Sequence, residues 1–234
     1  MSSSFDLIIK NGKCFIDGQL KKADIAISNG TIKEIGNIEA SNQKVLDANN
    51  LTVLPGVIDT QVHFREPGLT HKATIETESK AALAGGITSF LEMPNTNPQT
   101  TTLEQWEAKN ERAAQTSYAN YGFMFGGTND NLDQILALDT KRVPALKLFL
   151  GSSTGNMLVD NKQTLSQIFK NSSLLIATHC EDEETIRKNT SIFKAKYGEN
   201  IPFEMHPIIR SEEACYLSSS LAVDLAKKYE TRLH

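Results

Sequence analysis

Seven residues of types that bind metals or substrates end apolar runs of this 234-residue chain or lie within them. They are Asp59, Gln61, His63, Arg65, Asn95, Lys147 and His179. A neutral imidazole is a common metal ligand, and the planar guanidinium of arginine can pair with both oxygens of a carboxylate. Because alternate residues of a strand point the same way, we expect Asp59, Gln61 and His63 to share one face. A single histidine at a strand end is more often structural, so the repeated pattern carries the argument.

Lys147 is the candidate that is hardest to explain as a structural residue. It lies inside the apolar run Val143–Leu150, whereas lysine is almost never fully buried without a partner. Its side chain must therefore point to solvent or have a chemical reason to point inward. Asp59 is more ambiguous, since an aspartate at this position could equally cap a turn.

These candidates need elements that bring them together, and the chain alternates between apolar and helix-compatible segments. The apolar runs, which predict strands, are Val57–His63, Ile87–Met93, Asn120–Phe125, Val143–Leu150 and Ser173–His179. The segments that predict helices are Lys72–Leu83, Leu103–Ser117, Leu132–Leu138, Gln163–Phe169, Glu181–Lys196 and Ser211–Lys228. Such alternation predicts parallel strands with crossover helices, whose carboxyl ends form one rim. Five complete βα units result, and Arg232–His234 would open a sixth strand; both a doubly wound sheet and an eight-stranded barrel fit this pattern.

The first 55 residues predict a separate β-rich module. The Ile-rich segments Phe5–Lys10, Ala23–Ser28 and Thr31–Ile35 are typical of strands. Three dipeptides that favour tight turns separate or follow these segments: Asn11-Gly12, Asp17-Gly18 and Asn29-Gly30. We therefore expect a small antiparallel module ahead of the βα units.

Composition narrows the classes of protein and the cellular setting. Hydrophobic residues make up 39% and charged residues 22%, which is enough to bury a core. The net charge of −4, without a polybasic block, argues against nucleic acid and anionic membranes as partners. No apolar run has the length of a membrane span, and the first residues do not resemble a signal peptide. Three widely spaced cysteines, Cys14, Cys180 and Cys215, favour a reducing cytoplasm over a disulfide framework.

Four sequence blocks, in order, resemble the dihydroorotase branch of the amidohydrolase superfamily. They are Pro55–Asp59 with His63–Gly68, Ala84–Thr88 with Met93–Thr96, Lys147 within Leu146–Leu150, and Thr178–Asp182. This resemblance covers the whole chain. It implies an α/β fold, a (β/α)8 TIM-type barrel of which residues 56–234 supply about five units. Residues 1–55 would form a small β-sandwich module, completed by a C-terminal segment.

The same resemblance implies an activity, a cofactor and roles for the candidate residues. The activity is the zinc-dependent, reversible hydrolysis of dihydroorotate to N-carbamoyl-L-aspartate in pyrimidine biosynthesis. His63, His179 and a carboxylated Lys147 would bind one or two Zn²⁺ ions. Asp59 would support these ligands without binding the metal directly. Arg65 and Asn95 would bind the substrate carboxylate. The expected partners are a second copy of the chain, as a homodimer, and other enzymes of the pyrimidine pathway.

Two departures from the family pattern leave alternatives open. Gln61 stands where the family usually has a histidine, and an amide oxygen is a weaker zinc ligand, so we expect a weakened or single metal position. The family also has a strand-six histidine and a strand-eight aspartate beyond this segment. The chain is therefore expected to be an N-terminal portion that is inactive alone. The alternatives are another cyclic-amide hydrolase (hydantoinase, dihydropyrimidinase or allantoinase) or a non-catalytic scaffold, although Arg65 and Asn95 favour a substrate with a carboxylate.

Overall fold

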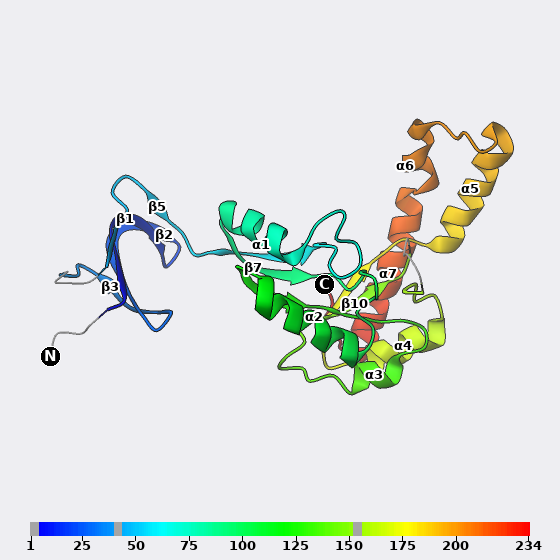
Figure 1. The fold of residues 1–234 in the computed structure, drawn as a ribbon. Coiled ribbons are helices and arrows are strands. Elements are labelled where there is room, and N and C mark those ends of the chain that lie inside the picture. Colours follow the sequence, from blue (N-terminus) through cyan, green and yellow to red (C-terminus); the bar gives the residue numbers. More distant parts are fainter. Residues whose placement is uncertain (1–4, 40–43, 152–155) are drawn as a thin grey trace. The chain divides into compact units, whose positions relative to one another are not determined.

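A computed structural model describes residues 5–39, 44–151 and 156–234 of the chain (Figure 1). The chain divides into two compact units, Met1–Gly56 and Val57–His234. None of the described helices combines the length and the apolar character needed to cross a membrane.

The first unit is built around one five-stranded sheet. Its strands are β1 (Leu7–Ile16), β2 (Gln19–Ser28), β3 (Thr31–Gly36), β4 (Val45–Asp47) and β5 (Thr52–Val53). β1, β2 and β3 pair antiparallel in that order, while β4 and β5 both pair parallel with β1. The two hairpins turn at Asp17-Gly18 and Asn29-Gly30, as predicted, and all four residues have positive φ. The described residues form a single sheet, so the sandwich stays a prediction.

The turn predicted at Asn11-Gly12 is wrong, because β1 continues through it. Asn11 has a φ of 63°, and the pairing with β2 shifts register between Ile9 and Gly12. An asparagine that adopts positive φ therefore makes a bulge here instead of a hairpin. Gly12 suits this place, since a Cβ there would lie 2.7 Å from the Val53 side chain.

The second unit contains parallel strands that follow one another in chain order. They are β6 (Val57–Val62), β7 (Ile87–Glu92), β8 (Asn120–Phe123), β9 (Phe125–Gly126), β10 (Leu146–Phe149) and β11 (Ile176–His179). Two three-stranded sheets result, β6-β7-β8 and β9-β10-β11. Only Met124 separates β8 from β9, and its N–H donates to the Glu92 carbonyl of β7. Leu233 forms a parallel bridge to Ile176, where a sixth strand was predicted.

This strand order bears on the choice that periodicity left open. In a doubly wound sheet, the chain first adds strands on one side of the first strand and then returns to add the later strands on its other side. Here each strand pairs with the next one along the chain within each sheet, and Met124 alone separates β8 of the first sheet from β9 of the second. No described strand reverses this order. The order agrees with a segment of a (β/α)8 barrel and disagrees with a doubly wound sheet.

Helices follow the strands, and local sequence sets where they begin. They are α1 (Ile75–Ala84), α2 (Leu103–Thr116), α3 (Leu132–Leu136), α4 (Lys162–Asn171), α5 (Glu183–Tyr197), η1 (Phe203–Met205), α6 (His206–Ile209) and α7 (Glu212–Tyr229). The side chains of Thr74, Thr102 and Asn161 accept hydrogen bonds from backbone N–H groups in the first turns of α1, α2 and α4. Ser211 caps α7 in the same way, as its sequence position predicted. The short segments η1 and α6 were not predicted.

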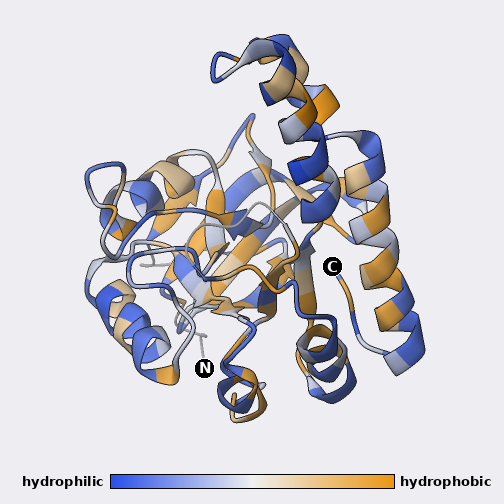
Figure 2. Cartoon of the chain, turned by 90° about the vertical axis from the view of Figure 1, so that its right-hand side faces the viewer, coloured by the Kyte–Doolittle hydropathy of each residue, from blue (hydrophilic) through white to orange (hydrophobic). Residues whose placement is uncertain are grey.

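The core of the second unit lies between the strands and these helices. Figure 2 shows hydrophobic residues in the inner strands, whereas the surrounding helices also carry many hydrophilic residues. Nine large side chains of this core are fully buried: Ile75, Phe90, Phe123, Phe125, Leu146, Leu148, Ile168, Phe169 and Ile176. This packing holds β7, β10 and β11 in place, and these strands carry or precede several candidate site residues.

Candidate active site

The candidate residues lie at or near the carboxyl ends of the parallel strands. His63 and Arg65 follow β6, and Asn95 follows β7. Lys147 is the second residue of β10, and His179 is the last residue of β11. Long segments of sequence separate these residues. Parallel pairing places the ends of β6 and β7 side by side in one sheet and the ends of β10 and β11 side by side in the other.

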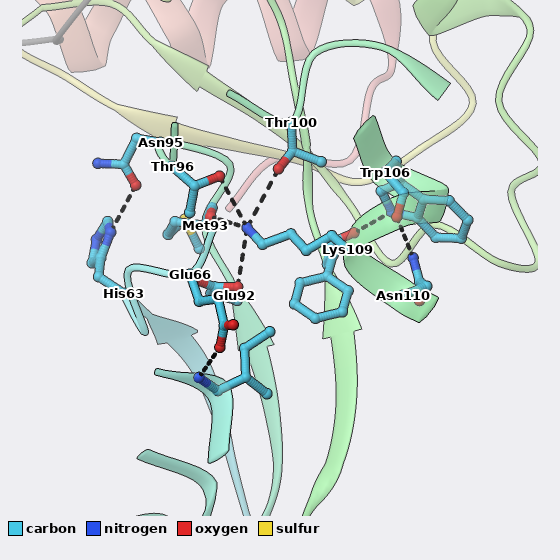
Figure 3. Close-up of polar contacts among 12 residues, drawn as sticks. His63, Glu66, Glu92, Met93, Asn95, Thr96, Thr100, Trp106, Lys109 and Asn110 are labelled. Carbon is cyan, nitrogen blue, oxygen red and sulfur yellow. Dashed lines mark hydrogen bonds and ion pairs between the residues drawn. The ribbon is translucent and has the colours of Figure 1, made fainter. Parts of the chain in front are cut away.

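His63 and Asn95 form the most direct contact within this set (Figure 3). The His63 Nδ1 and Asn95 Oδ1 atoms are 2.8 Å apart. Because a carbonyl oxygen only accepts, Nδ1 carries the proton in this contact and Nε2 keeps a lone pair. Burial lowers the pKa of His63; the bond to Asn95 opposes this, and the charges of Arg65 and Lys147 add to the lowering. A neutral imidazole with a free Nε2 is the form that binds a metal.

Lys147 points inward and is 3% exposed. Its ammonium stands 5.0 Å from the centre of the Phe149 ring. Within the described part of the chain, it has neither an ion-pair partner nor a hydrogen bond. Burial lowers the pKa of the Lys147 amine, which raises the fraction of neutral, nucleophilic amine. Among the described residues, the ammonium therefore has a cation–π contact with Phe149 but no carboxylate that would balance its charge.

His179 is tied to a carboxylate that a guanidinium holds in turn. Its Nε2 lies 2.9 Å from Glu181 Oε2, and Arg210 Nε lies 2.7 Å from Glu181 Oε1. Burial raises the pKa of Glu181, but the hydrogen bonds from Arg210 and His179 outweigh it and leave that pKa below its ordinary value. A metal that approached Nε2 of His179 would have to displace Glu181.

Asp59 and Gln61 sit in an irregular part of β6. The β6–β7 pairing shifts register between Asp59 and Val62, so two residues of β6 face one of β7. Strict alternation stops there, which removes the basis for expecting Asp59, Gln61 and His63 on one face. Asp59 Oδ1 accepts the backbone N–H of Gln61 at 3.0 Å, and Gln61 is exposed. Asp59 thus makes a local contact with the backbone, as expected for the turn-capping role that the sequence left open.

Arg65 and Asn95 line one cavity of about 560 Å³. Its lining consists of Arg65, Leu69, Lys72, Asn95, Thr96, Asn97, Gln99 and Asn156. Lys72 adds a second cation. Sequence reasoning did not single it out, because it placed Lys72 at the start of a predicted helix, where an exposed lysine is unremarkable. The cavity thus combines two positive charges with four side-chain amides, a composition suited to an anionic small molecule.

The candidate metal ligands fit zinc under one condition. Across the described residues, no three His, Cys, Asp or Glu side chains are grouped closely enough to hold a metal ion. His63 and His179 supply two imidazoles, and no described carboxylate forms an ion pair with the buried Lys147. An ammonium repels a cation, so this donor set fits zinc only if Lys147 is converted to an anionic carbamate.

Two charged residues near the candidate site were missed from the sequence. Glu92, at the end of β7, and Lys109, in α2, are 0% and 2% exposed and form an ion pair of 3.0 Å. The signal for Glu92 was available, since a carboxylate inside the apolar run Ile87–Met93 raises the same question as Lys147. Lys109 gave no such signal. Most residues of its helix are polar, so the sequence does not indicate which side of the helix is buried.

Comparisons with known proteins give relatives over nearly the whole chain. A dihydroorotase of Methanosarcina acetivorans is 33% identical over 98% of this chain and 49% of its own length. An allantoinase of Deinococcus radiodurans is 34% identical over 94% of this chain and 51% of its own length. Among solved structures, an L-hydantoinase (dihydropyrimidinase) from Arthrobacter aurescens superposes with a TM-score of 0.90, at 28% identity, over 98% of this chain and 52% of that one.

The chain therefore spans about half the length of the curated relatives it matches. The family model described as "Dihydro-orotase-like" matches residues 51–199, which include every candidate site residue. That model and the relatives confirm the resemblance read from the four sequence blocks: the chain belongs to the dihydro-orotase-like family.

Proposed function

We propose that this chain is the N-terminal part of a cyclic amidohydrolase that opens the ring of dihydroorotate. The observation that carries the proposal is the cavity shared by Arg65, Lys72 and Asn95. Dihydroorotate carries a carboxylate beside its cyclic amide, and a guanidinium with a neighbouring ammonium suits such an anion. Hydantoin and allantoin lack a carboxylate and give no use for this pair of cations.

We propose zinc as the cofactor, bound by His63, His179 and a carboxylated Lys147, with Gln61 as a weak fourth donor. A bound Zn²⁺ would polarise the amide carbonyl and lower the pKa of a water molecule. The lowered pKa values of His63 and Lys147, together with the lack of a carboxylate paired with Lys147 among the described residues, support this assignment. If Gln61 weakens one metal position, Gln61→His should raise the stoichiometry or affinity measured in a zinc titration. Equal values in the two proteins would remove that part of the proposal.

The residues of this chain would bind and orient the substrate. Arg65 would pair with both carboxylate oxygens, and the amide NH₂ of Asn95 would donate to the same group while its Oδ1 stays on His63. Asn95 would thereby connect substrate binding to the orientation of a metal ligand. The strands in chain order would be the first part of a (β/α)8 barrel, whose remaining strands complete the rim.

The proposal is tested by ring opening in the full-length protein. Dihydroorotate, hydantoin, dihydrouracil and allantoin are assayed with the zinc-loaded protein, with the protein after chelation, and after zinc is restored. Preference for dihydroorotate, lost on chelation and recovered with zinc, is the expected result. Preference for an uncharged ring would move the assignment to a hydantoinase or allantoinase. No turnover of any ring at any zinc level would favour the non-catalytic scaffold.

A further inference from the structure

The loops that carry Arg65 and Asn95 contact each other directly. The backbone N–H of Asn97 donates to the carbonyl of Pro67 at 3.1 Å. Gly68, with a φ of +79°, approaches so closely that a Cβ on it would lie 1.8 Å from the Asn97 carbonyl oxygen. The position of one loop therefore constrains the other, and both line the proposed substrate cavity.

The side chain of Lys109 extends toward the second of these loops (Figure 3). It extends from α2, and its Nζ donates to the carbonyl of Met93 at 3.2 Å, to Thr100 Oγ1 at 3.3 Å and to Thr96 Oγ1 at 3.5 Å. Those three residues lie on both sides of Asn95. A single buried ammonium thus ties together the start, the middle and the end of the loop.

Glu92 connects the same ammonium to the first loop. Its Oε2 lies 3.0 Å from Lys109 Nζ, and its side chain is completely buried. Burial raises the pKa of Glu92, whereas Lys109 and the backbone N–H groups of Phe64 and Arg65 lower it. Neither carboxylate oxygen has a hydrogen bond of good geometry to a described residue. The N–H groups of Phe64 and Arg65 in the first loop therefore favour the charged form of Glu92 without a hydrogen bond of ideal geometry to it.

A second ion pair from α2 supports the first loop in a more exposed position. Arg112 Nε lies 2.7 Å from Glu66 Oε1, and Glu66 Oε2 accepts the N–H of Ile75 at 2.8 Å. Lys109 and Arg112 are three residues apart, so one side of α2 presents both cations to the loops.

A buried ion pair is poor at stabilising a fold, because desolvation of two charges offsets most of their attraction and apolar residues of similar volume often do better. Lys109 does, however, donate to the loop of Asn95, and Glu92 pairs in the sheet with Val62 at the start of the other loop, where it interacts with the N–H groups of Phe64 and Arg65. We propose that Glu92 and Lys109 are positioning residues that hold Arg65 and Asn95 at the distance and orientation the substrate needs. This inference rests on the proposed function, since it assigns these two residues to the same cavity.

The test removes both charges together in the full-length protein, because removing one would leave an unpaired buried charge. Glu92→Leu with Lys109→Met keeps the site apolar and filled. The matched control is Glu107→Gln with Arg142→Met, which removes an exposed two-pronged ion pair from the same helix. Thermal unfolding and zinc content establish that each protein is folded and loaded.

Two measurements report on the position of the loops: the KM for dihydroorotate and hydrogen exchange of loop amides. The double variant should raise KM for dihydroorotate by about 10-fold or more, equivalent to about 1.4 kcal/mol, while kcat falls less than about 3-fold. Hydrogen exchange at the amides of Asn97 and Thr100, which donate to Pro67 and Pro94, should accelerate at least about 10-fold. The control should change neither quantity.

The outcomes separate the positioning role from the proposed function. A folded double variant with wild-type KM and wild-type exchange would overturn the positioning role. Faster exchange in a protein that opens no ring would uphold loop positioning and reject the amidohydrolase assignment. If the double variant does not fold, Thr100→Val tests the positioning role instead. This substitution removes one hydrogen-bond acceptor of Lys109 and keeps its ion pair with Glu92. A KM raised about 3-fold then supports the role, and an unchanged KM contradicts it.

Discussion

The His63 imidazole and the Asn95 amide are joined by a contact of 2.8 Å between Nδ1 and Oδ1. The first residue follows β6 and the second follows β7, so the bond joins two neighbouring strand ends. It leaves Nε2 of His63 with a lone pair and the NH₂ group of Asn95 facing away from the ring. One amide can therefore orient a metal ligand and bind a substrate at the same time.

Asn95→Ala should consequently impair two functions together. Zinc affinity should fall about 10- to 100-fold, as is typical when a ligand loses the group that orients it, and KM for dihydroorotate should rise. Isothermal titration with zinc and steady-state kinetics at saturating zinc measure the two effects separately. A rise in KM with unchanged zinc affinity would mean that Asn95 does not orient His63.

Arg65 and Lys72 should contribute unequally to binding of the carboxylate. Arg65→Met removes a two-pronged, charge-assisted contact and should raise KM about 10- to 100-fold with zinc content unchanged. Lys72→Met removes an exposed charge and should raise KM about 3-fold, an effect that salt reduces. Loss of zinc from Arg65→Met would place Arg65 with the metal instead of the substrate.

Lys147→Met should separate stability from activity. The substitution replaces a buried amine that has no described ion-pair partner by an apolar side chain of similar length. The metal-free protein should be as stable as wild type or more stable by about 1–3 kcal/mol in urea unfolding. Zinc content should fall, and activity should drop more than about 100-fold, beyond the loss expected for a residue that only orients a ligand. Retained zinc would contradict the carbamate assignment.

Asp24 should make the stability of the first unit depend on pH. Its oxygens accept the N–H groups of Asn11 and Ile38 at 2.9 and 3.1 Å, and Lys10 Nζ lies 3.1 Å away. Burial raises the pKa of Asp24, but these contacts outweigh it and hold that pKa below its ordinary value. A lowered folded-state pKa means that the stabilisation is present above the unfolded value, about 3.9, and disappears as the pH falls through the folded value.

Asp24→Asn should therefore cost about 1–3 kcal/mol at pH 7, and the difference should shrink at pH 3. Amide protection factors of β1 and β2 report this unit, because the single Trp106 lies in the other one. Asp17→Asn is the matched control, since the Asp17 side chain is 86% exposed. An equal loss of protection at both pH values would show that the charge of Asp24 is irrelevant.

Much of the architecture could be predicted because its determinants are local. Apolar runs predicted β7 and β10, and capping residues such as Ser211 marked helix starts. The failure at Asn11 has a physical reason, since positive φ suits a bulge as well as a turn and the choice depends on pairing with β2. The shift in β6 after Asp59 is of the same kind, because it depends on pairing with β7.

Residue types and their places in strands were thus determined by the sequence itself: the histidines, Arg65 and Asn95 at strand ends, and a lysine within an apolar run. Tertiary structure alone decided which of them meet. It joined His63 to Asn95, brought Lys72 into the cavity of Arg65, and buried Lys109 against Glu92. Propensity and periodicity act over a few residues, whereas these contacts join segments that only the packing of strands and helices brings within hydrogen-bonding distance.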